Sequence, residues 1–592
     1  MRIVLLSVLF AHLWTNAHAA IHDNVQDLLK QQNKFDFIVV GGGTAGNVVA
    51  NRLSENPNHS VLVLEAGGSN EGELLLEAPL LCLIASPSTK WDWNYTTTPQ
   101  SGLNDRTLAF PRGFVLGGSS SINYMVYTRG SKEDWDRMAH TADDERWSWD
   151  SLIPYMRRNE HFTQPADKHN TAGQFNPAVH GFTGVNSATL SGFQTEADDK
   201  VFAVTRDDPE FFPFNLDMNS GSQLGVGWTQ MTALNGARSS SATSYLAPQF
   251  VARPNLQVLL NARVTRVLPT LDNDFRTVEF LDAKGQIFSL TAAKEVVLSA
   301  GSVNTPNILL HSGIGDATAL SALGIKPLHN LPSVGANLTD HPLLPLAWFV
   351  DTNTSDTFDP IFQDPAVMQR VVEQWKETRT GRLTEVALSQ LAWLRIPSNS
   401  TIFDTTPDPA AGPTTAHYEM LFSNGFVGPT PDSGKYFGIT LAVVSPAARG
   451  SVSLASADPL APPRIDPNIL GAEIDLVIMR EALKAAFRFA AQPSLASYIT
   501  GEPPGLSSTF SDAQLDAFIR ANGATIFHPV GTAGMSPVGA SWGVVDPDLR
   551  VKGVKGLRVA DCSVIPLIPA AHTQAPAYIV GERAADFIKE DW

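Results

Sequence analysis

The sequence is poor in cysteine and in positive charge, and both shortages narrow what the protein can be. Only Cys82 and Cys562 occur in 592 residues, so the fold does not depend on a disulfide framework, although these two thiols could form a single bond. No CxxC pair and no HExxH motif indicates a metal site. The formal net charge is −17, which argues against nucleic acid and anionic membranes as partners, because both are negatively charged.

Long apolar runs are missing after the N-terminus, so we expect no membrane-spanning segment in the mature chain. Residues 1–19, MRIVLLSVLFAHLWTNAHA, have a basic second residue, an apolar stretch and a small-residue end. This pattern predicts a secretory signal peptide, with a buried N-terminal helix as the alternative. Secretion agrees with five Asn-x-Ser/Thr sites, at Asn58, Asn94, Asn337, Asn353 and Asn399. We expect an extracellular monomer.

The remaining composition is that of a globular protein. Hydrophobic residues make up 43% and charged residues 17% of the chain, so a large core is possible and disorder does not dominate. The chain is longer than the size at which one hydrophobic core keeps growing, and two domains or one two-part domain are therefore expected.

A nucleotide-binding pattern opens the mature chain. Residues 37–40 form a short apolar run typical of a buried parallel strand, and a glycine-rich turn comes next at Gly41, Gly43 and Gly46. Such a turn lets the backbone approach a pyrophosphate, and the next helix, starting near Thr44 and Ala45, directs free N–H groups at the phosphates.

An acidic residue lies at the end of the second predicted strand. Glu65, in VLVLEAG, lies 19 residues beyond Gly46, where a carboxylate accepts hydrogen bonds from the ribose hydroxyls of an adenosine. The same carboxylate would repel the 2′-phosphate of NADP. These residues predict dinucleotide binding and leave FAD and NAD both open.

Two further segments resemble the signatures of a known flavoenzyme family. They are GFVLGGSSSINYMVYTRG at 113–130 and GSVNTPNILLHSGIG at 301–315. Both are similar to the signature segments of the glucose-methanol-choline (GMC) oxidoreductases, although Phe114 stands where the family usually has a basic residue. Within the family, the densest likeness is to fungal aryl-alcohol oxidases, in WDWNYTTT (91–98), the segment 526–549 and AHTQAP (571–576).

The resemblance implies an α/β fold, α+β overall, in which a Rossmann-like FAD-binding domain is combined with a discontinuous substrate-binding domain built on a large antiparallel sheet. The FAD fold is expected to combine residues near 35–70, 220–340 and 540–592. Along the chain, 35–345 form the N-terminal FAD-binding region, 346–445 the substrate-binding region with an active-site loop, and 446–583 the C-terminal region with the catalytic histidines.

The resemblance also assigns residues to the flavin. Residues 255–268 look like a strand pair in which the backbone of Val264 meets the adenine end. Gly117, Gly118, Ser119 and Asn123 are expected to line the flavin, with Asp561 near the ribityl chain and Thr573 and Gln574 near the pyrimidine end of the ring. Some relatives attach FAD through a histidine, and none of residues 117–123 is one. We therefore predict non-covalent FAD.

Alcohol oxidation needs a group that takes the hydroxyl proton while the flavin takes a hydride. Histidine suits this task, because its ordinary pKa is near 6.5. By resemblance, His528 in IFHPVG is the base, and His572 in AAHTQAP hydrogen-bonds the alcohol oxygen. His341, in TDHP, is expected to be structural or to lie beside the flavin. The alternative, a pair of core histidines, is disfavoured by the family context.

Aromatic residues adjoin these positions. Phe527 and Tyr124 are expected to line the substrate cavity with Phe426, whose segment SNGFVGPTPDSG resembles the loop that covers the site in aryl-alcohol oxidases. Glu419 is a candidate for orienting His572. Rings favour an aromatic alcohol, whereas a sugar would need many polar partners. The prediction is an oxidase that passes electrons to O2; a quinone-dependent dehydrogenase and a flavin-containing hydroxynitrile lyase are the alternatives.

Overall fold

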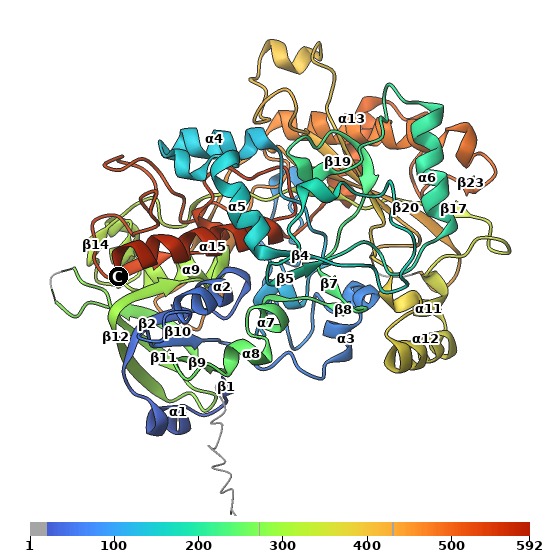
Figure 1. Ribbon diagram of the computed structural model, residues 1–592. Helices are drawn as coiled ribbons and strands as arrows, with labels where there is room; N and C mark the ends of the chain where they lie inside the picture. Colours follow the sequence, from blue (N-terminus) through green and yellow to red (C-terminus); the bar gives the residue numbers. More distant parts are fainter. Residues whose placement is uncertain (1–20, 272, 429–430) are drawn as a thin grey trace, which may run out of the picture.

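Two large β-sheets, surrounded by helices, form the body of the protein (Figure 1). The structure is a computed structural model that describes residues 21–271, 273–428 and 431–592. The predicted signal peptide, residues 1–19, lies outside the described residues.

The first sheet is a parallel Rossmann-like sheet with an antiparallel extension. Its strand order is β1-β9-β3-β2-β12-β11-β10, and β25 also pairs with β12. The strands β1, β9, β3, β2, β12 and β25 are parallel to one another, whereas β11 pairs antiparallel with both β12 and β10. The bounds are β1 Ile21–His22, β2 Phe35–Val40, β3 Val61–Leu64, β9 Leu256–Leu259, β10 Arg263–Leu268, β11 Thr277–Leu281, β12 Ile287–Leu298 and β25 Leu557–Val559.

The central strands of this sheet are buried on both faces. In β2 and β3 the apolar side chains of residues 37–40 and 61–64 are at most 2% exposed, as expected for strands that read as continuous apolar runs. Two helices distant in sequence, α2 (Thr44–Leu53) and α15 (Gln574–Asp591), pack against each other beside the sheet (Figure 1). The two ends of the chain thus build one domain.

One detail of the sequence prediction is wrong. Residues 255–268 do form two strands, β9 and β10, but these do not pair with each other. β9 pairs with β3 and β1, whereas β10 pairs with β11 at the opposite end of the sheet. The apolar pattern identifies strands, but it contains no information about which neighbour each strand selects.

The second sheet is antiparallel and has the order β23-β17-β20-β19-β18-β6, with β16 joining β20 to β24. Helix α13 (Glu473–Ala490) packs on β19 and β20. The bounds are β6 Gly225–Trp228, β16 Pro342–Leu344, β17 Ala347–Val350, β18 Gln390–Leu394, β19 Tyr418–Ser423, β20 Tyr436–Val443, β23 Ile499–Gly501 and β24 Ala524–Thr525. Strand β6 lies within 220–340 and yet belongs to this sheet, so that segment serves both domains.

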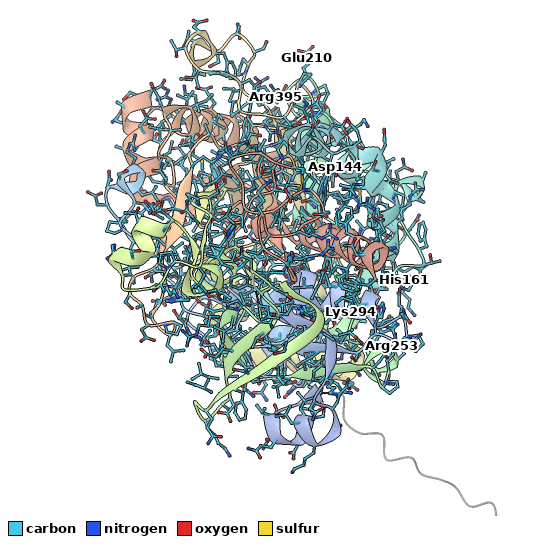
Figure 2. The ribbon with its side chains drawn as sticks, turned by 90° about the vertical axis from the view of Figure 1, so that its left-hand side faces the viewer. Asp144, His161, Glu210, Arg253, Lys294 and Arg395 are labelled. Atoms are coloured by element: carbon cyan, nitrogen blue, oxygen red, sulfur yellow. The ribbon has the colours of Figure 1, made fainter. Side chains whose placement is uncertain are left out.

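Together the two sheets confirm the predicted fold class. Among the residues labelled in Figure 2, Glu210 lies at the edge of the molecule and is exposed. Among the described residues, no helix is long and apolar enough to cross a membrane. The short strand pair β16–β24 positions the predicted base, because β24 ends three residues before His528.

Candidate active site

One cavity runs from the glycine-rich turn after β2 to the histidines beside the second sheet. Its volume is about 480 Å³, within the range of roughly 300 to 1,000 Å³ usual for ligand pockets. The predicted site residues that line it are Gly41, Gly43, Thr44, Ala45, Glu65, Gly118, Ser119, Asn123, Tyr124, Val264, Phe527, His528, Asp561, His572, Thr573 and Gln574.

The glycine-rich turn forms one end of the cavity. Helix α2 begins after Gly43, which has no side chain to cap the first N–H groups of the helix. These N–H groups, at Thr44 and Ala45, therefore remain available to an anion. Gly46 does not line the cavity; a Cβ there would lie 2.0 Å from the carbonyl oxygen of Gly41, so this glycine allows the helix to pack against the turn.

Glu65 lies fully buried at the same end. Its two carboxylate oxygens accept backbone hydrogen bonds from Gly42, at 2.8 Å, and from Gly67, at 2.7 Å. Burial raises its pKa to about 7. Each carboxylate oxygen has a second lone pair, so the group is both held in place and still able to accept from a ribose hydroxyl.

The middle of the cavity is built by residues from three distant segments. The Asp561 carboxylate accepts from the Gly301 N–H at 2.9 Å and from the Thr305 hydroxyl at 2.6 Å, which joins the second signature to the C-terminal region. Gly118 approaches Gly43 so closely that a Cβ on Gly118 would lie 2.8 Å from the Gly43 Cα. Gly117 does not line the cavity but adopts a φ of 91° to make this approach.

A hydrogen-bonded chain lies beside the cavity at Asn123. The Asn123 side chain donates to Gln574, and its oxygen accepts from Arg238 at 2.7 Å. Gln574 in turn donates to Thr232 at 2.9 Å. Helix α15, which begins at Gln574, therefore presents polar groups to the cavity that a flavin ring system requires.

The two predicted catalytic histidines meet, although they are 44 residues apart in sequence. The rings of His528 and His572 have centroids 4.8 Å apart at an interplanar angle of 75°. Glu419, on β19, is buried, and its Oε1 lies 3.1 Å from His572 Nε2. Glu419 does not itself line the cavity, whereas His528 and His572 do.

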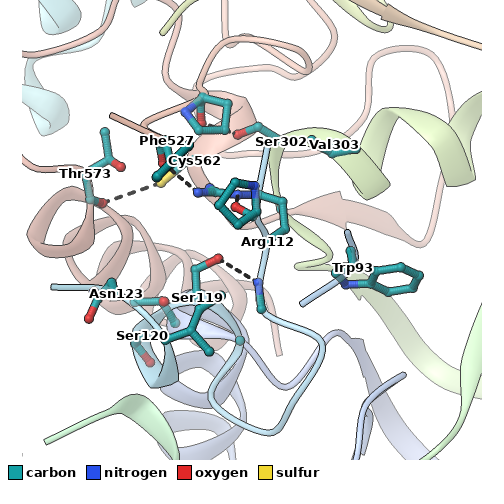
Figure 3. A pocket seen from close by; sticks show the side chains of 18 of the residues that line it. Trp93, Arg112, Ser119, Ser120, Asn123, Ser302, Val303, Phe527, Cys562 and Thr573 are labelled. Carbon is teal, nitrogen blue, oxygen red and sulfur yellow. Dashed lines mark hydrogen bonds between the residues drawn. The ribbon is translucent and has the colours of Figure 1, made fainter. Parts of the chain in front are cut away.

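A buried carboxylate and a partly buried guanidinium fix the backbone around His528. Asp340 accepts from the His528 N–H at 2.7 Å. Arg112 donates to the carbonyl oxygen of Phe527 at 2.6 Å, as Figure 3 shows. Phe527 has a φ of 66°, an uncommon conformation for a residue with a side chain. The turn that presents His528 is therefore held from both sides.

Burial keeps His528 uncharged. The pKa of His528 lies well below its ordinary value, chiefly because burial disfavours the charged ring and then because His572, His341 and Arg112 are close. Burial likewise raises the pKa of Asp340 to about 6. An uncharged histidine retains a lone pair, which is the requirement for a proton acceptor.

The substrate end of the cavity is mostly apolar. Tyr124 and Phe527 line it together with a group of aliphatic and proline residues, namely Leu343, Pro345, Leu388, Val427 and Ile526. Phe426 does not line the cavity, which corrects the prediction for this ring. Its side chain packs against Tyr436 instead, with centroids 5.4 Å apart, and its neighbours Val427 and Gly428 face the cavity in its place.

Several cavity residues were not predicted from the sequence. Arg112 and Trp93 line the cavity (Figure 3), and the ring of Trp93 meets Phe114 edge to face at 4.7 Å. Trp93 lies within a segment that resembles the family and Arg112 directly precedes another, so their proximity to these segments was the available signal. Cys562 also lines the cavity, and Cys82 lies buried elsewhere; both are free thiols, so the single disulfide that the sequence allows is not formed.

These features define a class of protein. A Rossmann-like sheet and free helix N–H groups at one end of a cavity can hold a dinucleotide. Two adjoining histidines, of which His528 is uncharged, provide a proton acceptor at the other end. An oxidoreductase needs both features. Among the described residues, no cluster of three or more His, Cys, Asp or Glu side chains is suited to a metal ion.

Comparison with known families specifies the class. The two GMC oxidoreductase family profiles match residues 35–343 and 446–581. The chain therefore belongs to the GMC oxidoreductases, a family of FAD-dependent enzymes acting on alcohols and sugars. The pyranose dehydrogenase of Agaricus campestris is 40% identical, over 97% of both chains, and the dehydrogenase eriK of Hericium erinaceus is 38% identical, over 96% of both chains.

Solved structures agree on the fold. A formate oxidase from Aspergillus oryzae superposes with a TM-score of 0.86 at 30% identity, covering 95% of this chain and 99% of the other. A fungal aryl-alcohol oxidase superposes with a TM-score of 0.81 at 25% identity, covering 95% and 100%. The sequence motifs suggested aryl-alcohol oxidases as the nearest group, yet the pyranose dehydrogenase and the dehydrogenase eriK are more similar over their whole length.

Proposed function

We propose that this enzyme oxidises aromatic primary alcohols, benzylic or allylic, to aldehydes, with His528 as the base. The observation behind this proposal is the cavity itself, in which His528 and His572 meet beneath a lining of Tyr124, Phe527 and aliphatic side chains. Aromatic rings contact one another with about 0.5 to 1.5 kcal/mol beyond the burial of area. A pyranose would leave several hydroxyls without partners against this apolar lining.

The chain's own residues supply the proton chemistry. Bound FAD would accept a hydride from the alcohol carbon, and Gly43, Thr44, Glu65 and Asn123 are placed to hold it. His528 accepts the hydroxyl proton on a ring nitrogen, since its lowered pKa leaves the ring uncharged. His572, held by Glu419, hydrogen-bonds the alcohol oxygen, and the apolar lining excludes water.

For the electron acceptor we propose an organic oxidant such as a quinone. Support comes from the relatives, because the similar proteins from Agaricus campestris and Hericium erinaceus are both named dehydrogenases. Oxygen, the acceptor expected from the motifs, is the competing candidate. A pyranose is the second candidate for the substrate that is oxidised, because the relative from Agaricus campestris is named a pyranose dehydrogenase.

An anaerobic experiment with the purified holoenzyme tests these proposals. Veratryl alcohol, cinnamyl alcohol and glucose are mixed separately with the enzyme, and bleaching of the flavin absorbance is followed. We expect fast bleaching by the two aromatic alcohols and slow bleaching by glucose; the reverse order would overturn the aromatic assignment. No bleaching, together with cleavage of mandelonitrile, would identify a lyase.

Reoxidation of the bleached enzyme then separates the acceptors. We expect benzoquinone to restore the yellow colour much faster than air-saturated buffer does. Rapid return in air, with one hydrogen peroxide formed per aldehyde, would instead show an oxidase.

Two further expectations about the protein remain proposals. FAD is proposed to be non-covalent, since none of residues 117–123 is a histidine that could form the linkage expected in some relatives; flavin that stays on the denatured chain would contradict this. The second expectation is that the protein is secreted as a monomer. Asn58, Asn353 and Asn399 are exposed, as glycosylation requires, and size measurement before and after deglycosylation is the test.

A further inference from the structure

A third histidine contacts the proposed base. His341 Nδ1 lies 3.1 Å from His528 Nδ1, and the two rings meet edge to face, with centroids 5.3 Å apart at an angle of 83°. His341 is 1% exposed. It precedes β16, whereas His528 comes after β24, and these two strands pair directly. The contact is therefore produced by the sheet and not by nearness in sequence.

The backbones of the same two residues share one acceptor. Asp340 Oδ1 accepts from the His341 N–H at 2.8 Å and from the His528 N–H at 2.7 Å. The other oxygen accepts from the hydroxyl of Thr525. One buried carboxylate thus sets the separation of the two rings, and the Nδ1 to Nδ1 distance is a consequence of the fold.

In such a contact, one proton lies between the two Nδ1 atoms. A neutral imidazole has one N–H and one lone pair, so either His528 donates to His341 or His341 donates to His528. In the first case the Nε2 atom of His528 has a lone pair; in the second it has a proton and is unable to act as a base. The direction of this single hydrogen bond decides whether His528 can react.

The position of His528 favours the first case. Its Nδ1 atom faces His341, so the nitrogen that His528 has left for a substrate in the cavity is Nε2. An uncharged His528 has a lone pair on Nε2 when its Nδ1 atom donates to His341.

We propose that His341 is a positioning residue that accepts the Nδ1 proton of His528 and thereby holds the Nε2 atom of His528 in the unprotonated form that accepts the substrate proton. This inference rests on the part of the proposed function that makes His528 the base. The tautomer of His528 exists whether or not any particular alcohol is a substrate.

Two replacements of similar volume test the kinetic consequence in the holoenzyme. His341→Asn places an amide oxygen near the position of Nδ1 and retains an acceptor, whereas His341→Leu removes it. We expect the anaerobic rate of flavin reduction to stay within about threefold of the wild-type rate in the Asn variant. In the Leu variant we expect it to fall by about 10- to 100-fold, part of the roughly 10² to 10⁴ available to base catalysis, with unchanged substrate affinity.

A matched control is His161→Asn, because His161 does not line the cavity and lies at the edge of the view in Figure 2; this variant should behave like the wild type. Equal rates in the Asn and Leu variants, whether both fast or both slow, would overturn the proposal.

A second measurement does not require turnover or a stable variant. In FAD-loaded wild-type enzyme labelled with ¹⁵N-histidine, the resonances that disappear in His528→Gln belong to the base. We expect these to show a protonated Nδ1 and an unprotonated Nε2. A proton on Nε2 would overturn the proposal, even for an enzyme whose substrate turned out to be a sugar. Failure of the aromatic assignment with the expected tautomer would leave the His341 inference standing.

Discussion

The pKa values of single side chains determine the pH range in which the proposed base can accept a proton. The pKa of His528 is lowered well below its ordinary value, first by burial and then by the nearby His572, His341 and Arg112; burial and His572 lower the pKa of His341 to about 3. A base with a lowered pKa stays unprotonated in mildly acidic solution. The proton acceptor is thus ready at a pH at which an exposed histidine would already be charged.

The first prediction concerns His528 and pH. We expect the wild-type rate of anaerobic flavin reduction to be nearly flat from pH 7 to pH 5, since protonation of the base requires a lower pH. His528→Ala should slow reduction by about 10² to 10⁴ with little change in substrate affinity. Stopped-flow absorbance gives both quantities, and a clear inflection near pH 6.5 would contradict the assignment.

Among single residues, the sequence predicted those that belong to recognisable motifs. His528, His572 and Asn123 were identified because their neighbours resemble family segments, and Glu419 was placed beside His572 correctly in space. The contact between His341 and His528 spans 187 residues and depends on the pairing of β16 with β24. No local pattern around either histidine reports that pairing, so the contact required the structure. Phe426 was misplaced for the same reason, because a loop's sequence does not say which of its side chains turns inward.

The start of α2 contains two glycines, one of which serves the packing of the fold and the other the ligand cavity. A Cβ on Gly46 would meet the Gly41 oxygen at 2.0 Å, whereas a Cβ on Gly43 has its nearest protein atoms at 3.9 Å. Gly43 lines the cavity and Gly46 does not. The two glycines therefore serve different purposes in one turn.

The second prediction separates these purposes. Gly46→Ala should lower the melting temperature of the apoprotein, because helix and turn must move apart. Gly43→Ala should leave that temperature nearly unchanged and weaken FAD binding, because its methyl group occupies space at the phosphate end. Scanning calorimetry of apoprotein and titration with FAD measure the two effects. Equal loss of apoprotein stability in both variants would contradict this division.

The third prediction concerns the segment after β19. The buried carboxylate of Asp359 accepts from the Phe426 N–H at 2.8 Å and from the Tyr436 N–H at 2.9 Å, which ties residues adjoining the cavity to the start of β20. Asp359→Asn replaces one acceptor with a donor. We expect a loss of about 1 to 3 kcal/mol of stability and a higher KM for the alcohol, because Val427 and Gly428 line the cavity.

Thr357→Val is the matched control for Asp359. It removes only the Thr357 hydroxyl that donates to the same carboxylate at 2.7 Å, and it leaves both backbone hydrogen bonds in place. KM should change little in this variant. An unchanged KM in Asp359→Asn would show that the carboxylate does not position the cavity lining.

Among the elements, the sequence predicted those whose pattern lies within one continuous segment. The order of β2, α2 and β3 is predictable from an apolar run, a glycine turn and Glu65. The pairing of β9 and β10 was predicted incorrectly, because their adjacency in sequence suggests a hairpin while burial on both faces places β9 beside β3. Non-local pairing depends on the whole sheet, which a single-sequence pattern does not describe.

For the molecule as a whole, a buried acid far from the motifs affects stability. Glu385 is fully buried, with Arg382 Nε 3.3 Å from its carboxylate, and burial raises its pKa to about 8. In the unfolded chain the same carboxyl ionises near its ordinary value of about 4.3. Between these values the folded protein binds a proton that the unfolded chain lacks, so stability decreases as the pH rises, by up to about 1.4 kcal/mol per pH unit.

The fourth prediction follows from this decrease in stability with rising pH. Glu385→Gln removes the titration, so the melting temperature of the variant relative to the wild type should increase between pH 5.5 and pH 8. Differential scanning fluorimetry at a series of pH values measures the difference. Parallel curves for the two proteins would mean that Glu385 does not bind a proton on folding. Glu279→Gln, at a surface ion pair with Arg266, is the control and should give parallel curves.

The packing of α15 against α2 has a consequence for the order in which the protein is made. The glycine turn leaves the ribosome early, but the helix face covered by α15 and the cavity wall formed by Thr573 and Gln574 emerge only when synthesis ends. Until then, the apolar face of α2 needs protection, since domains fold as units during synthesis. The cavity is therefore complete only after the C-terminal helix has been made, and a chain that ends before residue 574 has the nucleotide motif without the whole pocket.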